Sequence, residues 1–196
     1  MTRSLRQYKR MIAGLGLAGM LTVSMAMPAF AAETAVGAAV TGGTLAATID
    51  TTLTVTTVEY DYALAQEITN TPMALTVDDS TGLADGWNVQ IISSVFDHTG
   101  GDGTTDIGAA AFVLSTPGAP SLNSGQAISI VAGEGPEVGV GGSLDTSRKV
   151  IKAAADFGQG NYGQSLPSTF TYPVRAQAGA YTATLTTSLV AGPGGI

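Results

Sequence analysis

The sequence predicts an all-β protein, an antiparallel β-sandwich of Greek-key, Ig-like general architecture. Short runs in which apolar and polar residues alternate recur along the chain, which is the pattern of strands with one buried face. Gly, Pro, Asn and Asp are concentrated between these runs, where tight turns need their backbone conformations. Helical periodicity is scarce in a chain rich in Thr, Val, Ala and Gly. Many short strands separated by turns are typical of sandwiches and barrels.

The clearest early strand covers residues 52–62. Its apolar residues change parity after Val55 and end with Tyr60 and Tyr62 on the other face, which predicts a β-bulge or a break between two strands. Residues 147–156 fit a short helix or a strand, and both alternatives stay open. Further strands are predicted at residues 73–77, 87–95, 110–115, 126–132, 168–175 and 180–190.

The segments between these strands are predicted to be loops and turns. They carry most of the Gly, Pro, Asn and Asp residues of the mature chain, which supply the positive and fixed φ angles of turns. The predicted connectors are residues 78–86, 96–108, 116–125, 133–147 and 156–167.

The first 31 residues have the features of a cleaved secretory signal. Four basic residues and no acid precede an apolar stretch that ends at Pro28, and Ala29 and Ala31 are small residues that signal peptidase accepts. A flexible arm, residues 32–42, and one domain, residues 43–196, should follow. No second long apolar run is present, so we expect a secreted chain with no membrane span after cleavage.

The mature chain would be strongly acidic. It keeps four Lys and Arg residues against fifteen Asp and Glu residues, a net charge of −11. So few cations argue against binding to nucleic acid or anionic lipid, and the acidity favours solubility outside the cell. The absence of cysteine excludes disulfides, thiolate metal sites and catalytic thiols.

Two segments resemble the WxL domain of Gram-positive surface proteins. One is LTVDDSTGLADGWNVQIISSVF, and the other is TFTYPVRAQAGAYTATLTTSLVAGP near the C-terminus. The family carries a Trp-x-Leu motif after an aspartate-containing turn and a later Tyr-x-x-x-Leu-Thr-Trp-x-Leu run. Here the first motif has Trp87 and Val89, with valine in place of leucine. The resemblance extends from about Thr41 to Pro193.

The second family motif is matched at Tyr181, Leu185 and Leu189, but Thr187 stands where the family has its second tryptophan. The second Trp-x-Leu motif is therefore lost. The resemblance implies an all-β domain that attaches non-covalently to the cell wall, with peptidoglycan as the ligand.

Aromatic residues are the candidate glycan-binding groups: Trp87, Tyr60, Tyr62 and Tyr162. Trp87 shares strand parity with Val89, and a ring on the apolar face is more often core than a binding platform. The smaller side chain of Thr187 would either open a pocket or be repacked. The sequence leaves those two alternatives open.

The loop at residues 96–108 contains Asp97, Asp102 and Asp106, which are spaced as calcium ligands could be. The loop lacks the EF-hand pattern and its closing Glu. Exposed turn aspartates are the preferred interpretation. We therefore predict no cofactor, with a weak calcium site as the alternative.

No constellation in the sequence indicates an enzyme. His98 is the sole histidine and has no Gly-x-Ser-x-Gly partner, so a solvated loop residue is expected. Asp78 and Asp79 are adjacent, and adjacent side chains diverge too much for a glycosidase pair. LPSTF at residues 166–170 lacks the other elements of a sortase signal.

The sequence thus predicts a non-catalytic cell-surface protein that binds cell-wall glycan or other surface proteins. The alternative is a structural subunit of an extracellular fibre or surface layer, self-assembled by strand addition with the arm as donor.

Overall fold

The computed structural model describes residues 39–49, 58–59, 61–99 and 105–192. The regular elements in this part of the chain are antiparallel strands, apart from one short 3₁₀ helix. The elements are β1 (Leu45–Ile49), β2 (Gln66–Thr69), β3 (Met73–Asp79), β4 (Trp87–Ser93), β5 (Asp97–His98), η1 (Ala109–Ala111), β6 (Phe112–Leu114), β7 (Ser121–Gly125), β8 (Glu137–Val138), β9 (Gly142–Ser143), β10 (Arg148–Ala153), β11 (Gly160–Leu166), β12 (Ser168–Tyr172), β13 (Tyr181–Thr182) and β14 (Leu185–Ala191).

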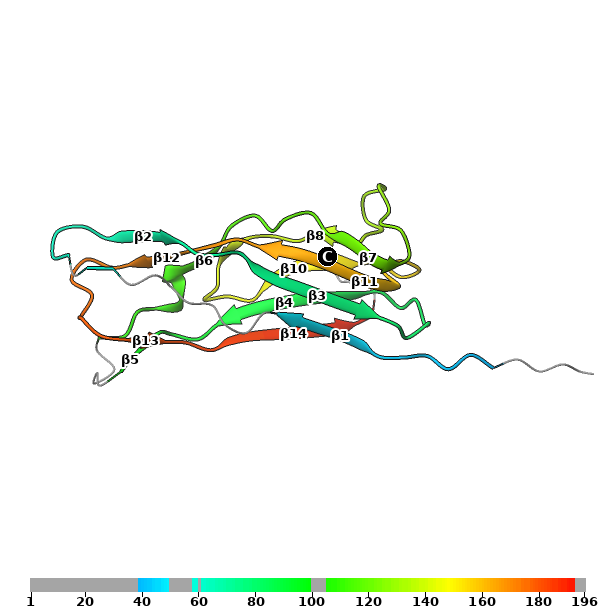
Figure 1. The fold of residues 1–196 in the computed structure, drawn as a ribbon, viewed down its shortest axis with the longest axis horizontal. Helices are drawn as coiled ribbons and strands as arrows, with labels where there is room; N and C mark the ends of the chain where they lie inside the picture. Colours follow the sequence, from blue (N-terminus) through cyan, green and yellow to red (C-terminus); the bar gives the residue numbers. More distant parts are fainter. Residues whose placement is uncertain (1–38, 50–57, 60, 100–104, 193–196) are drawn as a thin grey trace, which may run out of the picture. The chain divides into compact units, whose positions relative to one another are not determined.

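The strands form sheets that pack together as a β-sandwich, which confirms the predicted fold class (Figure 1). One four-stranded sheet has the order β1-β3-β11-β7 and a second has the order β14-β4-β10-β8. A third sheet, β2-β12-β6-β9, and the ribbon β13-β5 extend the two layers toward one end.

Two long antiparallel ladders run through these sheets. In one, the β3–β11 pairing ends at Met73 opposite Leu166, and the β2–β12 pairing resumes at Thr69 opposite Thr169. In the other, β4 and β14 lead into β5 and β13. The first ladder therefore connects the two ends of the domain (Figure 1).

The core lies between the two main sheets. On β3 and β4 every second side chain points inward, so Leu75 and Val77 of β3 pack in one core with Trp87 and Val89 of β4. All of these side chains are at most 1% exposed. The alternation of apolar and polar residues in the sequence therefore corresponds to buried and less buried positions, as expected for strands with one covered face.

Several predicted strands are confirmed with adjusted ends. Residues 73–77 and 87–95 correspond to β3 and β4, and residues 168–175 correspond to β12 up to Tyr172. The segment 110–115 begins in the 3₁₀ turn before β6, and 180–190 divides into β13 and β14. Residues 148–153 form β10, so the strand alternative was right there.

Four connector predictions and one strand prediction are wrong. β5 lies within residues 96–108, and β8 and β9 lie within residues 133–147. β11 lies within residues 156–167 and pairs with both β3 and β7, and β7 itself lies within residues 116–125. Residues 126–132, predicted as a strand, form a loop in which Ile130 is fully exposed. The backbone there bonds locally, as in the Ser129 N–H to Gly135 carbonyl contact of 3.4 Å.

Some predictions lie outside the described residues. They are the signal segment, most of the N-terminal arm, and residues 52–57 and Tyr60 of the early strand. The described neighbours Val58, Glu59 and Asp61 are not in a strand. Within the described residues, the structure contains no helix of the length and apolarity that spanning a membrane requires.

Candidate functional site

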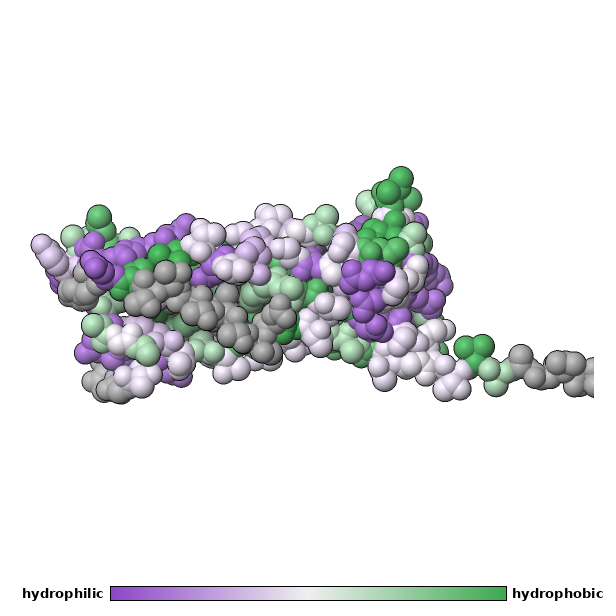
Figure 2. All heavy atoms as spheres, viewed as in Figure 1, coloured by the Kyte–Doolittle hydropathy of each residue, from purple (hydrophilic) through white to green (hydrophobic). Residues whose placement is uncertain are grey.

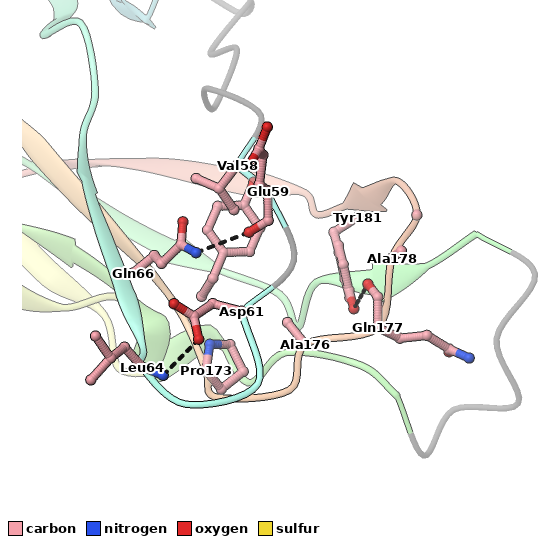
Figure 3. Close-up of a pocket in the computed structure, with 12 residues that line it drawn as sticks. Val58, Glu59, Asp61, Leu64, Gln66, Pro173, Ala176, Gln177, Ala178 and Tyr181 are labelled. Atoms are coloured by element: carbon pink, nitrogen blue, oxygen red, sulfur yellow. Dashed lines mark hydrogen bonds between the residues drawn. The ribbon is translucent and has the colours of Figure 1, made fainter.

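A pocket of about 230 Å³ lies at the end of the domain beyond β2 and β12 (Figure 3). We call it the end pocket. Its walls combine aromatic, aliphatic, amide and carboxylate groups, which is the usual mixture in a site for a small polar ligand. The lining residues are Val58, Glu59, Asp61, Leu64, Gln66, Tyr172, Pro173, Ala176, Gln177, Ala178, Gly179 and Tyr181.

The first wall of the end pocket is held by Asp61. Its carboxylate accepts a hydrogen bond from the N–H of Ala63 at 2.7 Å. It accepts another from the N–H of Leu64 at 3.0 Å (Figure 3). Its carbonyl oxygen accepts one from the N–H of Arg175 at 3.1 Å. Side chains of Asp commonly fix turns in this way. The turn before β2 and the turn after β12 are thereby tied together.

The strands bring Gln66 and Tyr172 to the base of these turns. The two residues pair at the end of the β2–β12 ladder. Gln66 also donates from Nε2 to the carbonyl of Glu59 at 2.9 Å (Figure 3). Pro173 follows β12 and has no N–H to continue the ladder, so the chain turns away there and opens the pocket.

The opposite wall comes from β13 and the segment before it. The hydroxyl of Tyr181 donates to the carbonyl of Gln177 at 2.8 Å (Figure 3). The ring of Tyr181 packs on the ring of His98, with centroids 4.9 Å apart. Gly179 has a φ of +155°, and a Cβ there would lie 2.1 Å from Nε2 of His98. Glycine is therefore needed for this close approach.

Burial raises the pKa of both pocket tyrosines. For Tyr181 the nearby Asp106 also raises the pKa, while the hydrogen bond to Gln177 opposes the rise. For Tyr172 the neighbouring Tyr181 adds to the effect of burial. Both phenols are therefore uncharged at neutral pH and present apolar ring faces together with a polar hydroxyl.

Trp87 and Tyr162 lie in the core and expose no ring surface. Both are 0% exposed, and their ring centroids lie 6.2 Å apart in the core. The hydroxyl of Tyr162 donates to the carbonyl of Gln126 at 2.7 Å. The preferred interpretation of Trp87 as a core residue is confirmed, and the weaker assignment of both rings to glycan binding is corrected.

The remaining candidate tyrosines fall near the end pocket or outside the described residues. Tyr62 is 71% exposed and directly follows Asp61, which lines the pocket. Tyr60 lies outside the described residues. No sequence pattern singles out Tyr172, Gln66 or Asp61, because the pairing of β2 with β12 brings them together.

The family-motif residues have different surroundings. Val89 is buried in the core, and Leu185 and Leu189 are half-buried on β14 and pack against it. Tyr181 lines the end pocket. Thr187 is half-buried opposite Ile91 and does not line that pocket.

The acidic loop does not assemble a metal site in the described residues, where no group of three or more His, Cys, Asp or Glu side chains could hold an ion. Asp102 lies outside them. Asp97 is exposed, and Asp106 accepts a hydrogen bond from the N–H of His98 at 2.9 Å. His98 itself is half-buried against Tyr181, so the expected solvated loop histidine is corrected.

The side chains of Asp78 and Asp79 diverge, as predicted. Asp78 accepts a hydrogen bond from Asn161 at 2.9 Å. Asp79 is buried and accepts from the hydroxyl of Thr81 at 2.7 Å. Each carboxylate thus has its own hydrogen-bond partner.

Comparisons of this chain with family models, curated proteins and solved structures found no match.

Proposed function

We propose that the chain is a secreted, non-catalytic cell-surface protein, similar to the WxL group, that binds peptidoglycan non-covalently. The observation that supports this proposal is the end pocket, where two uncharged tyrosines stand beside amides and carboxylates. Non-covalent binding can rest on these groups and requires no catalytic residue.

The chemistry of the lining suits a sugar. The apolar face of a sugar ring can pack against tyrosine, while hydroxyl and amide groups of the glycan bond to Gln66, Gln177 and Asp61. Tyr62 adds an exposed ring beside the pocket. A pocket of about 230 Å³ is small, so it would hold one sugar unit of a longer strand.

A pull-down with purified sacculi tests the proposal. The wild-type chain should sediment with sacculi above the level of serum albumin, and Tyr62→Ala and Gln177→Ala should reduce the bound fraction. Leu83→Ala is the matched control, because Leu83 is 68% exposed but belongs to the β3–β4 loop and not to the pocket. Binding no greater than that of albumin would refute wall binding.

A second candidate function is a structural subunit assembled from copies of the chain. Strand β1 is an edge of its sheet among the described strands, and Val40, just before it, is 96% exposed. Edge strands accept added strands through main-chain hydrogen bonds. Electron microscopy of the concentrated protein tests this candidate. Filaments that disappear when residues 32–42 are removed would identify the arm as donor.

A further inference from the structure

The loop at residues 126–135 carries large apolar side chains into solvent. We call it the apolar loop. Ile130 is 101% exposed and Val131 is 54% exposed. Figure 2 shows a hydrophobic projection rising from the end of the domain where β7 lies. Exposed apolar groups gathered on a projection mark a contact with another molecule.

Hydrogen bonds fix the apolar loop at its base and within its turn. The N–H of Gln126 donates to the carbonyl of Gln159 at 2.7 Å, and the N–H of Ala154 donates to the carbonyl of Glu134 at 2.8 Å. The hydroxyl of Ser129 donates to the carboxylate of Glu134 and accepts from the N–H of Val131 at 3.1 Å. Binding through such a loop loses little conformational entropy.

The apolar loop and the end pocket lie at opposite ends of the sandwich. The loop follows Gly125, which pairs with Gly160 at the start of β11. From there β11 and β12 run to Tyr172, which lines the pocket. The twelve residue-to-residue steps from Gly160 to Tyr172 span about 40 Å in extended chain. Figure 1 shows the two strands following one another along the domain.

We propose that the apolar loop of one copy inserts Ile130 and Val131 into the end pocket of a second copy. The pocket offers Leu64, which is 67% exposed, together with Pro173 as apolar contacts. Because the two surfaces differ and lie at opposite ends, the contact is heterologous and leads to an open filament. The inference builds on the second candidate function and replaces strand addition by a side-chain contact.

One pair of opposite charges near the two surfaces favours this contact. The exposed Arg175 adjoins the pocket through its bond to Asp61, and Glu134 lies at the base of the loop. The one ion pair among the described residues joins Lys152 to Glu137, so Arg175 has no acidic partner in that set. The pocket carboxylate of Asp61 is itself bound by two N–H groups.

Sedimentation velocity tests the proposal with two kinds of variant. The protein is recovered after export and measured at high concentration. Ile130→Asp removes the loop contact, and Leu64→Asp removes the pocket contact; Ala178→Trp, at an exposed lining position, is a second pocket variant. Each should weaken self-association by about tenfold or more. Leu83→Asp is the control, since it places the same charge at another exposed leucine.

Mixing supplies the decisive result. An Ile130→Asp chain keeps its pocket and a Leu64→Asp chain keeps its loop, so an equal mixture should form a one-to-one complex that grows no further. A loop-to-loop dimer would instead persist in both pocket variants, and that result would overturn the proposal. A wild-type chain that stays monomeric would also overturn it.

Two further readouts separate this proposal from the others. Ile130→Asp should still bind sacculi, because its pocket is intact, so wall binding and self-association fail independently. Filaments that survive Ile130→Asp but disappear without residues 32–42 would refute the loop contact in favour of strand addition. Melting temperatures equal to that of the wild type establish that the exposed substitutions leave the fold intact.

Discussion

The indole Nε1 of Trp87 donates a hydrogen bond to the carbonyl oxygen of Gly158 at 3.0 Å, across the buried end of β4. Gly158 has a φ of +82°, and an added Cβ would lie 2.4 Å from Cβ of Ala153 and 2.9 Å from the indole nitrogen. The ring is therefore packed against a backbone position that only glycine can occupy without displacing its neighbours.

Gly158→Ala should lower the free energy of unfolding by about 3 kcal/mol or more, because it combines overpacking with backbone strain. Gly82→Ala is the matched control: Gly82 has a φ of +70°, but no atom lies within 4 Å of an added Cβ. Its cost should be about 1 kcal/mol. Urea unfolding followed by circular dichroism measures both, and equal costs would contradict the packing argument.

Trp87→Ala should cost about 3–5 kcal/mol, the range for truncating a large core ring. The cause is the loss of buried contacts with Tyr162 and of the bond to Gly158. Leu83→Ala, at an exposed position, should change stability by less than about 0.5 kcal/mol. A stable Trp87→Ala protein that no longer binds sacculi would show that the ring acts as a binding platform after all.

Stability should fall as the pH rises above about 10, the ordinary tyrosine pKa. Burial, with a smaller contribution from Asp79, raises the pKa of Tyr162 in the folded protein. Above the ordinary value the unfolded chain releases a proton that the folded chain keeps, so unfolding is favoured until the folded pKa is passed. Below that pH the hydroxyl of Tyr162 is protonated in both the folded and the unfolded chain, so it adds no pH dependence to the stability.

Tyr162→Phe should therefore make the alkaline decline shallower. At neutral pH it should cost about 1 kcal/mol, because the carbonyl of Gln126 loses its hydroxyl partner. Urea titrations at pH 7, 9 and 11 measure both effects. An unchanged slope between pH 9 and pH 11 would assign the decline to Tyr172 and Tyr181, whose pKa values are also raised.

Calcium should leave the melting temperature unchanged, because Asp106 already binds the N–H of His98. Differential scanning calorimetry with added calcium and then with a chelator measures this. A rise that the chelator reverses, and that Asp102→Asn abolishes, would establish the weak site that the aspartate spacing suggests.

The alternation of apolar and polar residues predicted the strands that have one buried face. It failed for the buried strand that lacks this pattern and for the exposed loop that has apolar residues. β3, β4 and β14 were predictable because side chains on one face pack into the core. β11 was missed because its sequence, GNYGQSL, is polar and glycine-rich, although both its edges are paired. The apolar residues of QAISIVA suggested a strand, but the loop bonds to itself and to neighbouring turns.

The candidate site was predictable only in fragments. Tyr62 and Tyr181 were named from the sequence, but the pocket depends on turns that Asp61 and Pro173 fix beside the last pair of β2 and β12. The pairing of strands distant in sequence sets that geometry. Tyr162 looked equivalent to Tyr62 in the sequence, yet one is in the core and the other is exposed.

The register of β1 gives the domain a polarity. Leu45 pairs with Asp79, so the N-terminal residues 40–44 leave from the end that carries the apolar loop, opposite the end pocket. A copy held to the wall by its pocket would direct its loop and residues 40–44 outward. Later copies would attach by filling their own pockets with that loop. A filament would then contain a single glycan-bound copy whatever its length, and its mass would grow without occupying further wall sites.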